Sequence, residues 1–150
     1  MHARGLFFVY LHMRNPPEIP KQTQTWESSI ATYWMHESGY LVSNSKPIKR
    51  TVANLKENHQ LVHSITGGKP IPLLLFLTSS PVPDKAARDY SAEMLPKLYS
   101  KMAMVSEPGL SAFVMRLLFK FKPFPIPVKF FTDQEEAENW LQFNSASSGF

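Results

Sequence analysis

The sequence of 150 residues contains no cysteine, and this absence limits the chemistry open to the chain. Disulfide bonds, thiolate zinc sites and a cysteine nucleophile are excluded. No apolar run approaches the roughly 18 to 20 residues that a membrane-spanning helix needs, so we expect no transmembrane segment. Neither a P-loop nor a GxGxxG motif is present, and no nucleophile and base can be paired from the sequence. These absences favour a protein that is not an enzyme.

Charge is sparse and only weakly unbalanced. Sixteen Lys and Arg against twelve Asp and Glu give a formal net charge of +4. A nucleic-acid-binding surface needs a clustered basic stripe, which this sequence does not contain, so we expect no nucleic-acid partner. The absence of cysteine is compatible with a cytoplasmic protein, and the cytoplasm is the location that we expect.

The length fits one domain with short extensions. We expect residues 1–25 to be a disordered N-terminal extension, because Asn15–Thr25 carries three prolines and little that could be buried. A targeting segment is the alternative for the apolar start of the chain, although polar and charged residues interrupt it. The domain itself is expected at residues 26–144, followed by a polar tail at 145–150.

Hydrophobic periodicity predicts the secondary structure. In Gly109–Phe121 apolar residues recur at intervals of three and four, which is typical of an amphipathic helix. The run Pro72–Leu77 is apolar throughout and suits a central parallel strand that is buried on both faces. Pro96 is expected to end or kink a helix. The other predicted elements are a hairpin of Ser29–His36 and Tyr40–Ser43, helices at Thr51–Ile65 and Asp84–Leu95, strands at Lys101–Val105 and Val128–Phe131, and a last helix opened by a Thr132–Glu135 capping box.

The order of these elements is ββαβαβαβα, which defines an α/β fold. Strand, helix and strand in succession imply right-handed crossovers and parallel pairing. We therefore predict a mixed, mostly parallel sheet of about five strands covered by four helices, with Pro72–Leu77 near its centre.

The chain resembles the STAS domain superfamily, and within it an uncharacterised bacterial SpoIIAA-like group that is also described as STAS/SEC14-like. The resemblance covers roughly Ala31–Phe143. It is carried by the order and spacing of short motifs, namely Gly67–Pro70 before an apolar strand, Lys85–Tyr90 at a helix start, Lys122-Pro123, and Phe131–Ala137 followed by Trp140.

This resemblance implies a SpoIIAA-like fold and a non-enzymatic regulatory or protein-interaction module. In STAS regulators a serine at the start of the second helix accepts phosphate and follows an aspartate. Asp84 matches that aspartate, whereas Lys85 and Ala86 stand where the serine would be, so the resemblance does not carry the acceptor over.

A loop at the carboxyl end of the apolar strand is the first candidate site. Thr78, Ser79 and Ser80 lie in it, followed by Asp84 and Arg88. Loops in this position commonly form ligand crevices in parallel sheets, so we expect a partner or ligand loop. The alternatives are that the hydroxyls only satisfy a polar turn and that Asp84 only caps a helix.

A second candidate site is an interface on the predicted helix Gly109–Phe121. Ala112, Met115 and Phe119 form a second apolar stripe on this helix, and Arg116 and Lys120 lie at its rim. An apolar patch of this kind favours binding of another protein or a homodimer contact. Coverage by the N-terminal extension or by loops of the same chain is the alternative.

No cofactor is expected. His59 and His63 are four residues apart on a predicted helix, but no third metal ligand is evident, so we expect no metal site. Two functions from different classes are left. The first is a STAS-like protein-interaction module, and the second is a binder of an apolar small molecule or lipid, which a cavity between the sheet and the helices would favour.

Overall fold

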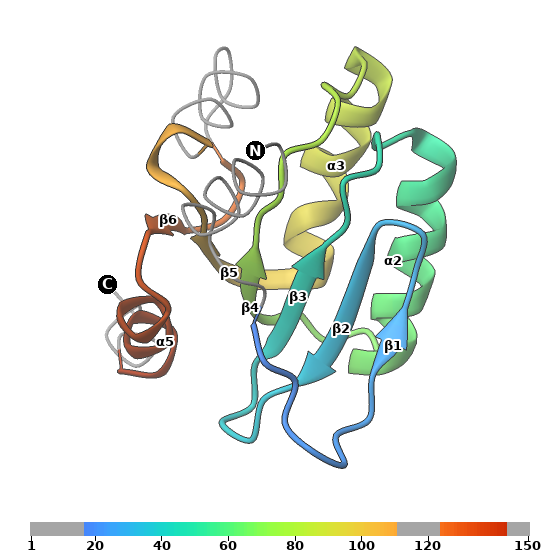
Figure 1. Ribbon diagram of the computed structural model, residues 1–150. Coiled ribbons are helices and arrows are strands. Elements are labelled where there is room, and N and C mark those ends of the chain that lie inside the picture. Colours follow the sequence, from blue (N-terminus) through green and yellow to red (C-terminus); the bar gives the residue numbers. More distant parts are fainter. Residues whose placement is uncertain (1–16, 111–123, 144–150) are drawn as a thin grey trace, which may run out of the picture.

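The computed structural model describes residues 17–110 and 124–143. Within these ranges the chain forms one sheet of six strands in the order β1-β2-β3-β4-β5-β6 (Figure 1). The strands are β1 (Trp26–Glu27), β2 (Ala31–Met35), β3 (Leu41–Ser45), β4 (Ile71–Phe76), β5 (Tyr99–Val105) and β6 (Val128–Phe131).

The sheet is mixed, as its sequence predicts. The β1–β2 and β2–β3 pairs are antiparallel, whereas β3–β4, β4–β5 and β5–β6 are parallel. The expected fold class is therefore confirmed, with six strands instead of about five. The additional strand, β1, is only two residues long, which is too short for a periodic pattern to be visible in the sequence.

Helix α2 (Val52–Thr66) links β3 to β4 and has both ends capped. The Thr51 hydroxyl accepts a hydrogen bond from the Asn54 N–H, and the Asn54 side chain accepts one from the Thr51 N–H. At the other end Gly67 has a φ of 71°, a left-handed conformation that glycine adopts without steric cost.

Helix α3 (Lys85–Leu98) links β4 to β5 and corrects one expectation. Pro96 lies inside the helix and does not end it, because α3 continues to Leu98 and leads directly into β5 at Tyr99. A proline removes one N–H from the helix, and this loss is tolerable at an exposed position in the last turn. The strand β5 consequently begins two residues before the expected Lys101.

Helix α5 (Gln134–Phe143) follows β6 and corrects a second expectation. The carboxylate of Asp133, rather than the Thr132 hydroxyl, accepts a hydrogen bond from the N–H of the third helical residue, Glu136. Asp and Thr both serve as N-caps, so the one-residue shift is within the ambiguity of the motif. Of the predicted helix Gly109–Phe121, only Gly109 and Leu110 lie among the described residues, where both are helical.

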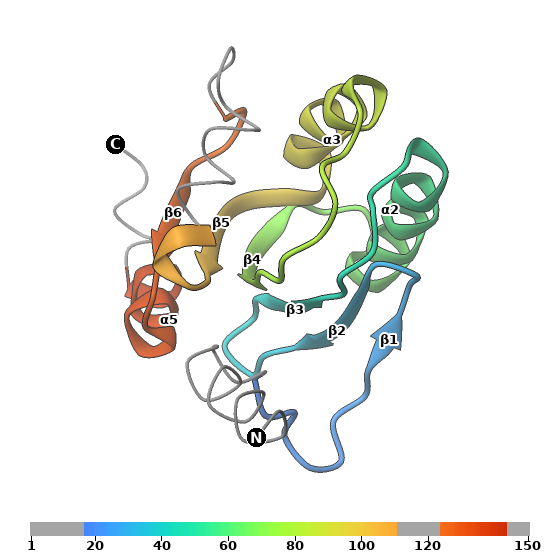
Figure 2. The ribbon, with the colours of Figure 1, turned by 45° about the horizontal axis from the view of Figure 1, so that its top comes forward.

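The described helices lie on both sides of the sheet. Figure 2 shows α2 and α3 on one side, here called the α2/α3 face, and α5 on the other. Strand β4 has buried residues on both faces, with Leu73 packed on the α2/α3 side and Leu74 and Phe76 on the α5 side. The expectation of a central apolar strand is therefore confirmed.

Truncation of a side chain in β4 tests this arrangement. Leu74 is 1% exposed, so Leu74→Ala should lower the free energy of unfolding by about 2–5 kcal/mol through lost burial and a new cavity. Ile48→Ala, at a side chain that is 45% exposed, should change it by about 0.5 kcal/mol or less. Urea denaturation measures both, and equal effects would contradict the central position of β4.

Candidate functional site

A cavity of about 250 Å³ lies between the α2/α3 face of the sheet and the two helices. Its floor is formed by inward-facing residues of β4 and β5, among them Leu73, Leu75, Met102 and Met104. Its roof includes Leu55 from α2 and Leu95 from α3. The described lining is predominantly apolar, as in sites that bury most of a small ligand.

Strand β3 contributes small polar side chains where a core strand would ordinarily present large apolar ones. Ser43 and Ser45 point toward the cavity, and both are buried. Ser43 pairs with Tyr33 on β2 and with Leu75 on β4, and Ser45 pairs with Ala31 on β2. The row formed by Ala31 and Ser45 therefore leaves space under the helices.

Arg50 lines the cavity beside this row. Its guanidinium donates hydrogen bonds to the carbonyl oxygens of Lys46 at 2.6 Å, Ile48 at 2.7 Å and Ile30 at 3.1 Å, and to the Ser45 hydroxyl at 2.6 Å. The connection after β3 is thereby fastened to the start of β2. Burial lowers the pKa of Arg50 below its usual value, and no carboxylate of the described residues forms an ion pair with it.

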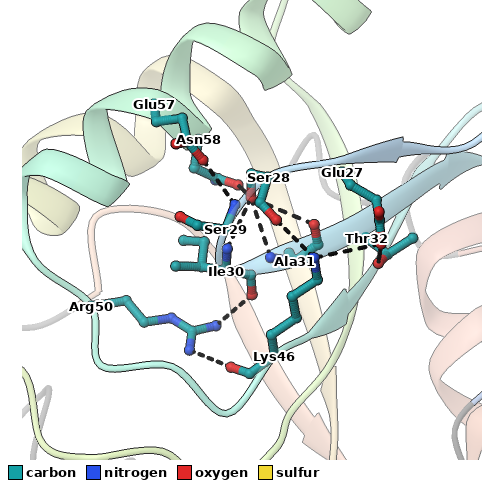
Figure 3. A network of polar contacts seen from close by, with 10 residues as sticks. All are labelled: Glu27, Ser28, Ser29, Ile30, Ala31, Thr32, Lys46, Arg50, Glu57 and Asn58. Atoms are coloured by element: carbon teal, nitrogen blue, oxygen red, sulfur yellow. Dashed lines mark hydrogen bonds and ion pairs between the residues drawn. The ribbon is translucent and has the colours of Figure 1, made fainter.

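A second polar network joins the hairpin to α2 (Figure 3). The amide oxygen of Asn58 accepts hydrogen bonds of 2.8 Å from the Ser28 and Tyr33 hydroxyls. The Ser28 hydroxyl oxygen also accepts hydrogen bonds of 3.2 Å from the backbone N–H groups of Ile30 and Ala31. Burial raises the pKa of Tyr33, whose hydroxyl therefore stays protonated and able to donate.

The predicted loop site is brought together in part. Thr78, Ser80 and Arg88 all line the cavity, at the end where β3 and β4 finish. The Thr78 hydroxyl donates to the Ser45 carbonyl at 3.3 Å, and Arg88 donates to the Pro83 carbonyl at 2.8 Å. Ser79 is exposed and does not line the cavity.

Asp84 is placed differently from the other predicted residues. Its carboxylate accepts a 2.9 Å hydrogen bond from the Ala87 N–H, so it is the N-cap of α3, and it does not line the cavity. Of the two roles that the sequence left open for Asp84, the structure shows the helix cap. The predicted interface residues Ala112, Met115, Arg116, Phe119 and Lys120 lie outside the described part of the chain.

The two helical histidines stack on one another, with ring centroids 6.3 Å apart. Burial lowers the pKa of His59, and the neighbouring His63 and Lys97 lower it further. In residues 17–110 and 124–143 no group of three or more potential ligands could hold a metal ion. None of the helices in these ranges has the length and apolar character needed to cross a bilayer.

Sequence reasoning missed the polar side of the cavity, namely Tyr33, Ser43, Ser45, Arg50 and Asn58. One signal was present in β3, where serines occupy alternate positions facing the same way as Leu41. Serines at the inward positions of a strand indicate a polar or incompletely filled interior.

Comparison with known proteins agrees with this fold. Residues 33–144 match the family described as "Domain of unknown function (DUF7793)", and the chain belongs to this family. No curated protein matches the sequence. The chain is similar to a crystal structure from Shewanella loihica PV-4 of an uncharacterised protein from the DUF3478 family with a SpoIIAA-like fold. The TM-score is 0.50 and the identity 20%, over 79% of this chain and 91% of that one.

The fold is therefore SpoIIAA-like, as the sequence resemblance implies. At this level of identity the match establishes the arrangement of helices and strands. The biochemical role has to be argued from the cavity itself.

Substitution of Arg50 tests its part in shaping the cavity. Arg50→Gln should lower the free energy of unfolding by about 1–3 kcal/mol, because the partly buried carbonyl oxygens of Ile30 and Lys46 and the Ser45 hydroxyl lose their charged donor. Arg50→Lys should have an intermediate effect, since an ammonium group has fewer donors than a guanidinium. Lys49→Gln removes an exposed charge next to it and should be nearly neutral. If urea denaturation gave the same free energy of unfolding for Arg50→Gln and Lys49→Gln, the hydrogen bonds of Arg50 would not contribute to stability.

Proposed function

We propose that this protein is a non-catalytic module that binds an apolar small molecule in the cavity of the α2/α3 face. The main support for this proposal is the volume of the cavity. An engineered apolar cavity of about 150 Å³ is sufficient to bind benzene. On the same scale, the 250 Å³ found here would hold a ligand with roughly ten carbon atoms.

The position of the cavity supports the proposal. It is bounded by the loop that follows β4, as ligand crevices in parallel sheets commonly are. Val82 in this loop lines the cavity and is also 45% exposed, so the cavity reaches the protein surface there. A ligand could therefore enter without separation of the helices from the sheet.

The composition of the lining supports binding without catalysis. Among the described residues that line the cavity there is no histidine, aspartate or glutamate, the side chains that most often act as general bases. Its hydroxyl groups have no such base beside them among these lining residues. We therefore propose capture or sensing of the ligand rather than its conversion.

The protein-interaction role implied by the sequence resemblance stays a prediction, because its interface residues lie outside the described part of the chain. The cavity favours the ligand-binding role. A ligand that contacts α3 and the Thr78–Pro83 loop would also alter the surface through which a regulatory module meets its partner.

A variant that fills the cavity tests the proposed function. The wild-type protein should bind 1-decanol in isothermal titration calorimetry. Ser91 lines the cavity from α3, so Ser91→Phe should weaken this binding about tenfold or more by occupying the space.

Glu93→Phe is the matched control for this experiment. It adds the same side chain to an exposed position of the same helix, and it should leave decanol binding unchanged. Melting temperatures of both variants establish that they fold. If the wild type binds decanol and Ser91→Phe and Glu93→Phe bind it equally well, the proposed function is contradicted.

A further inference from the structure

The charges that line the cavity all have one sign. Among the described lining residues only Arg50 and Arg88 carry a charge, and no carboxylate is present to balance them. The ion pairs of residues 17–110 and 124–143 lie elsewhere, between Lys46 and Glu27 and between Lys85 and Asp89. An apolar cavity with cationic side chains and no acidic partner favours an anionic ligand.

The two arginines differ in what their N–H groups already bind. Arg50 makes four hydrogen bonds to protein oxygens, so it is largely committed to the structure. Arg88 makes one, to the Pro83 carbonyl. A guanidinium has five donors, so most of those on Arg88 are available to a ligand. Because Arg88 is half-buried, a charged hydrogen bond there is less screened by water than on the open surface.

The charged end of the cavity is followed by large apolar residues along α3 and β4. Arg88 and Ser80 lie at the end where β4 finishes, near the exposed Val82. Deeper positions along α3 and β4 are Leu95 and Leu73. The helix rises roughly 10 Å between Arg88 and Leu95, which is enough for a short alkyl chain to extend inward from the arginine.

We infer that the ligand is a monoanionic amphiphile, namely a carboxylate with an unbranched apolar chain of roughly eight to ten carbons. Its carboxylate accepts hydrogen bonds from the Arg88 guanidinium and the Ser80 hydroxyl, and its chain lies over Leu75 and Met104. One available guanidinium matches one negative charge. This inference rests on the proposed function, since it names the class of molecule that the cavity takes.

The acidic side chains near the start of α3 are engaged elsewhere. The Asp84 carboxylate accepts a hydrogen bond from the Ala87 N–H, and the Asp89 carboxylate accepts one of 2.7 Å from the Lys85 ammonium. Neither lines the cavity, so neither occupies the place of the ligand carboxylate.

The test compares two molecules that differ only in the charge of the head group. Calorimetric titrations at pH 7.5 should give decanoate an affinity about tenfold or more above that of 1-decanol, because a charged hydrogen-bonded pair forms only with decanoate. Arg88→Gln should weaken decanoate binding about tenfold and change decanol binding by less than about threefold. Arg88→Lys should recover part of the loss, since it keeps the charge without the planar fork.

Lys85→Gln is the matched control, because it removes a positive charge from the same turn of α3 outside the cavity, and it should not affect decanoate binding. Equal affinities for decanoate and decanol, or equal effects of Arg88→Gln and Lys85→Gln, would overturn the head-group assignment and leave the apolar cavity in place. Binding of neither molecule by the wild type would instead overturn the proposed function, and this inference with it.

Discussion

The site depends on a shortage of side-chain volume on one face of the sheet. Strand β3 directs Ser43 and Ser45 toward α2 and α3, and Ser45 is level with Ala31 on the neighbouring strand. Protein interiors are ordinarily packed to the density of organic crystals, so three small side chains in adjoining positions leave a gap that the rest of the core has to surround. Large apolar residues of β4 and β5 form the remaining floor, and the result is a predominantly apolar cavity.

Polar contacts keep this gap from collapsing. Arg50 fixes the connection between β3 and α2 by hydrogen bonds to three carbonyl groups, and Asn58 holds α2 to the hairpin through Ser28 and Tyr33. These groups have definite hydrogen-bond directions, so the helix cannot slide toward the sheet without leaving buried polar atoms unpaired. Among the described residues, Arg88 on α3 donates one hydrogen bond, to the Pro83 carbonyl, so most of its five donors are open to a ligand.

Much of the fold could be predicted because it depends on local patterns. The apolar run that became β4, the hairpin and the strand Val128–Phe131 are all visible as periodicity and turn residues. The loop site was predictable in outline, since loops after parallel strands meet at one edge of the sheet, and Thr78, Ser80 and Arg88 do line the cavity there.

The polar framework was not predictable because its contacts are long-range. Arg50 reaches the carbonyl of a residue 20 positions away, and Asn58 meets a tyrosine 25 positions away. No local spacing rule links such residues. The cavity itself is a property of several elements together, since it arises where small residues of two strands lie beneath two helices.

Methionine methyl groups give the most direct test of the account. Met102 and Met104 line the cavity, whereas Met35 is 36% exposed and does not line it. With ¹³C-methyl-labelled methionine and bound decanoate, intermolecular nuclear Overhauser effects are expected between the alkyl chain and the methyl groups of Met102 and Met104. Contacts confined to Met35, or none at the two cavity methionines when decanoate is bound, would contradict a ligand-binding cavity on this face of the sheet.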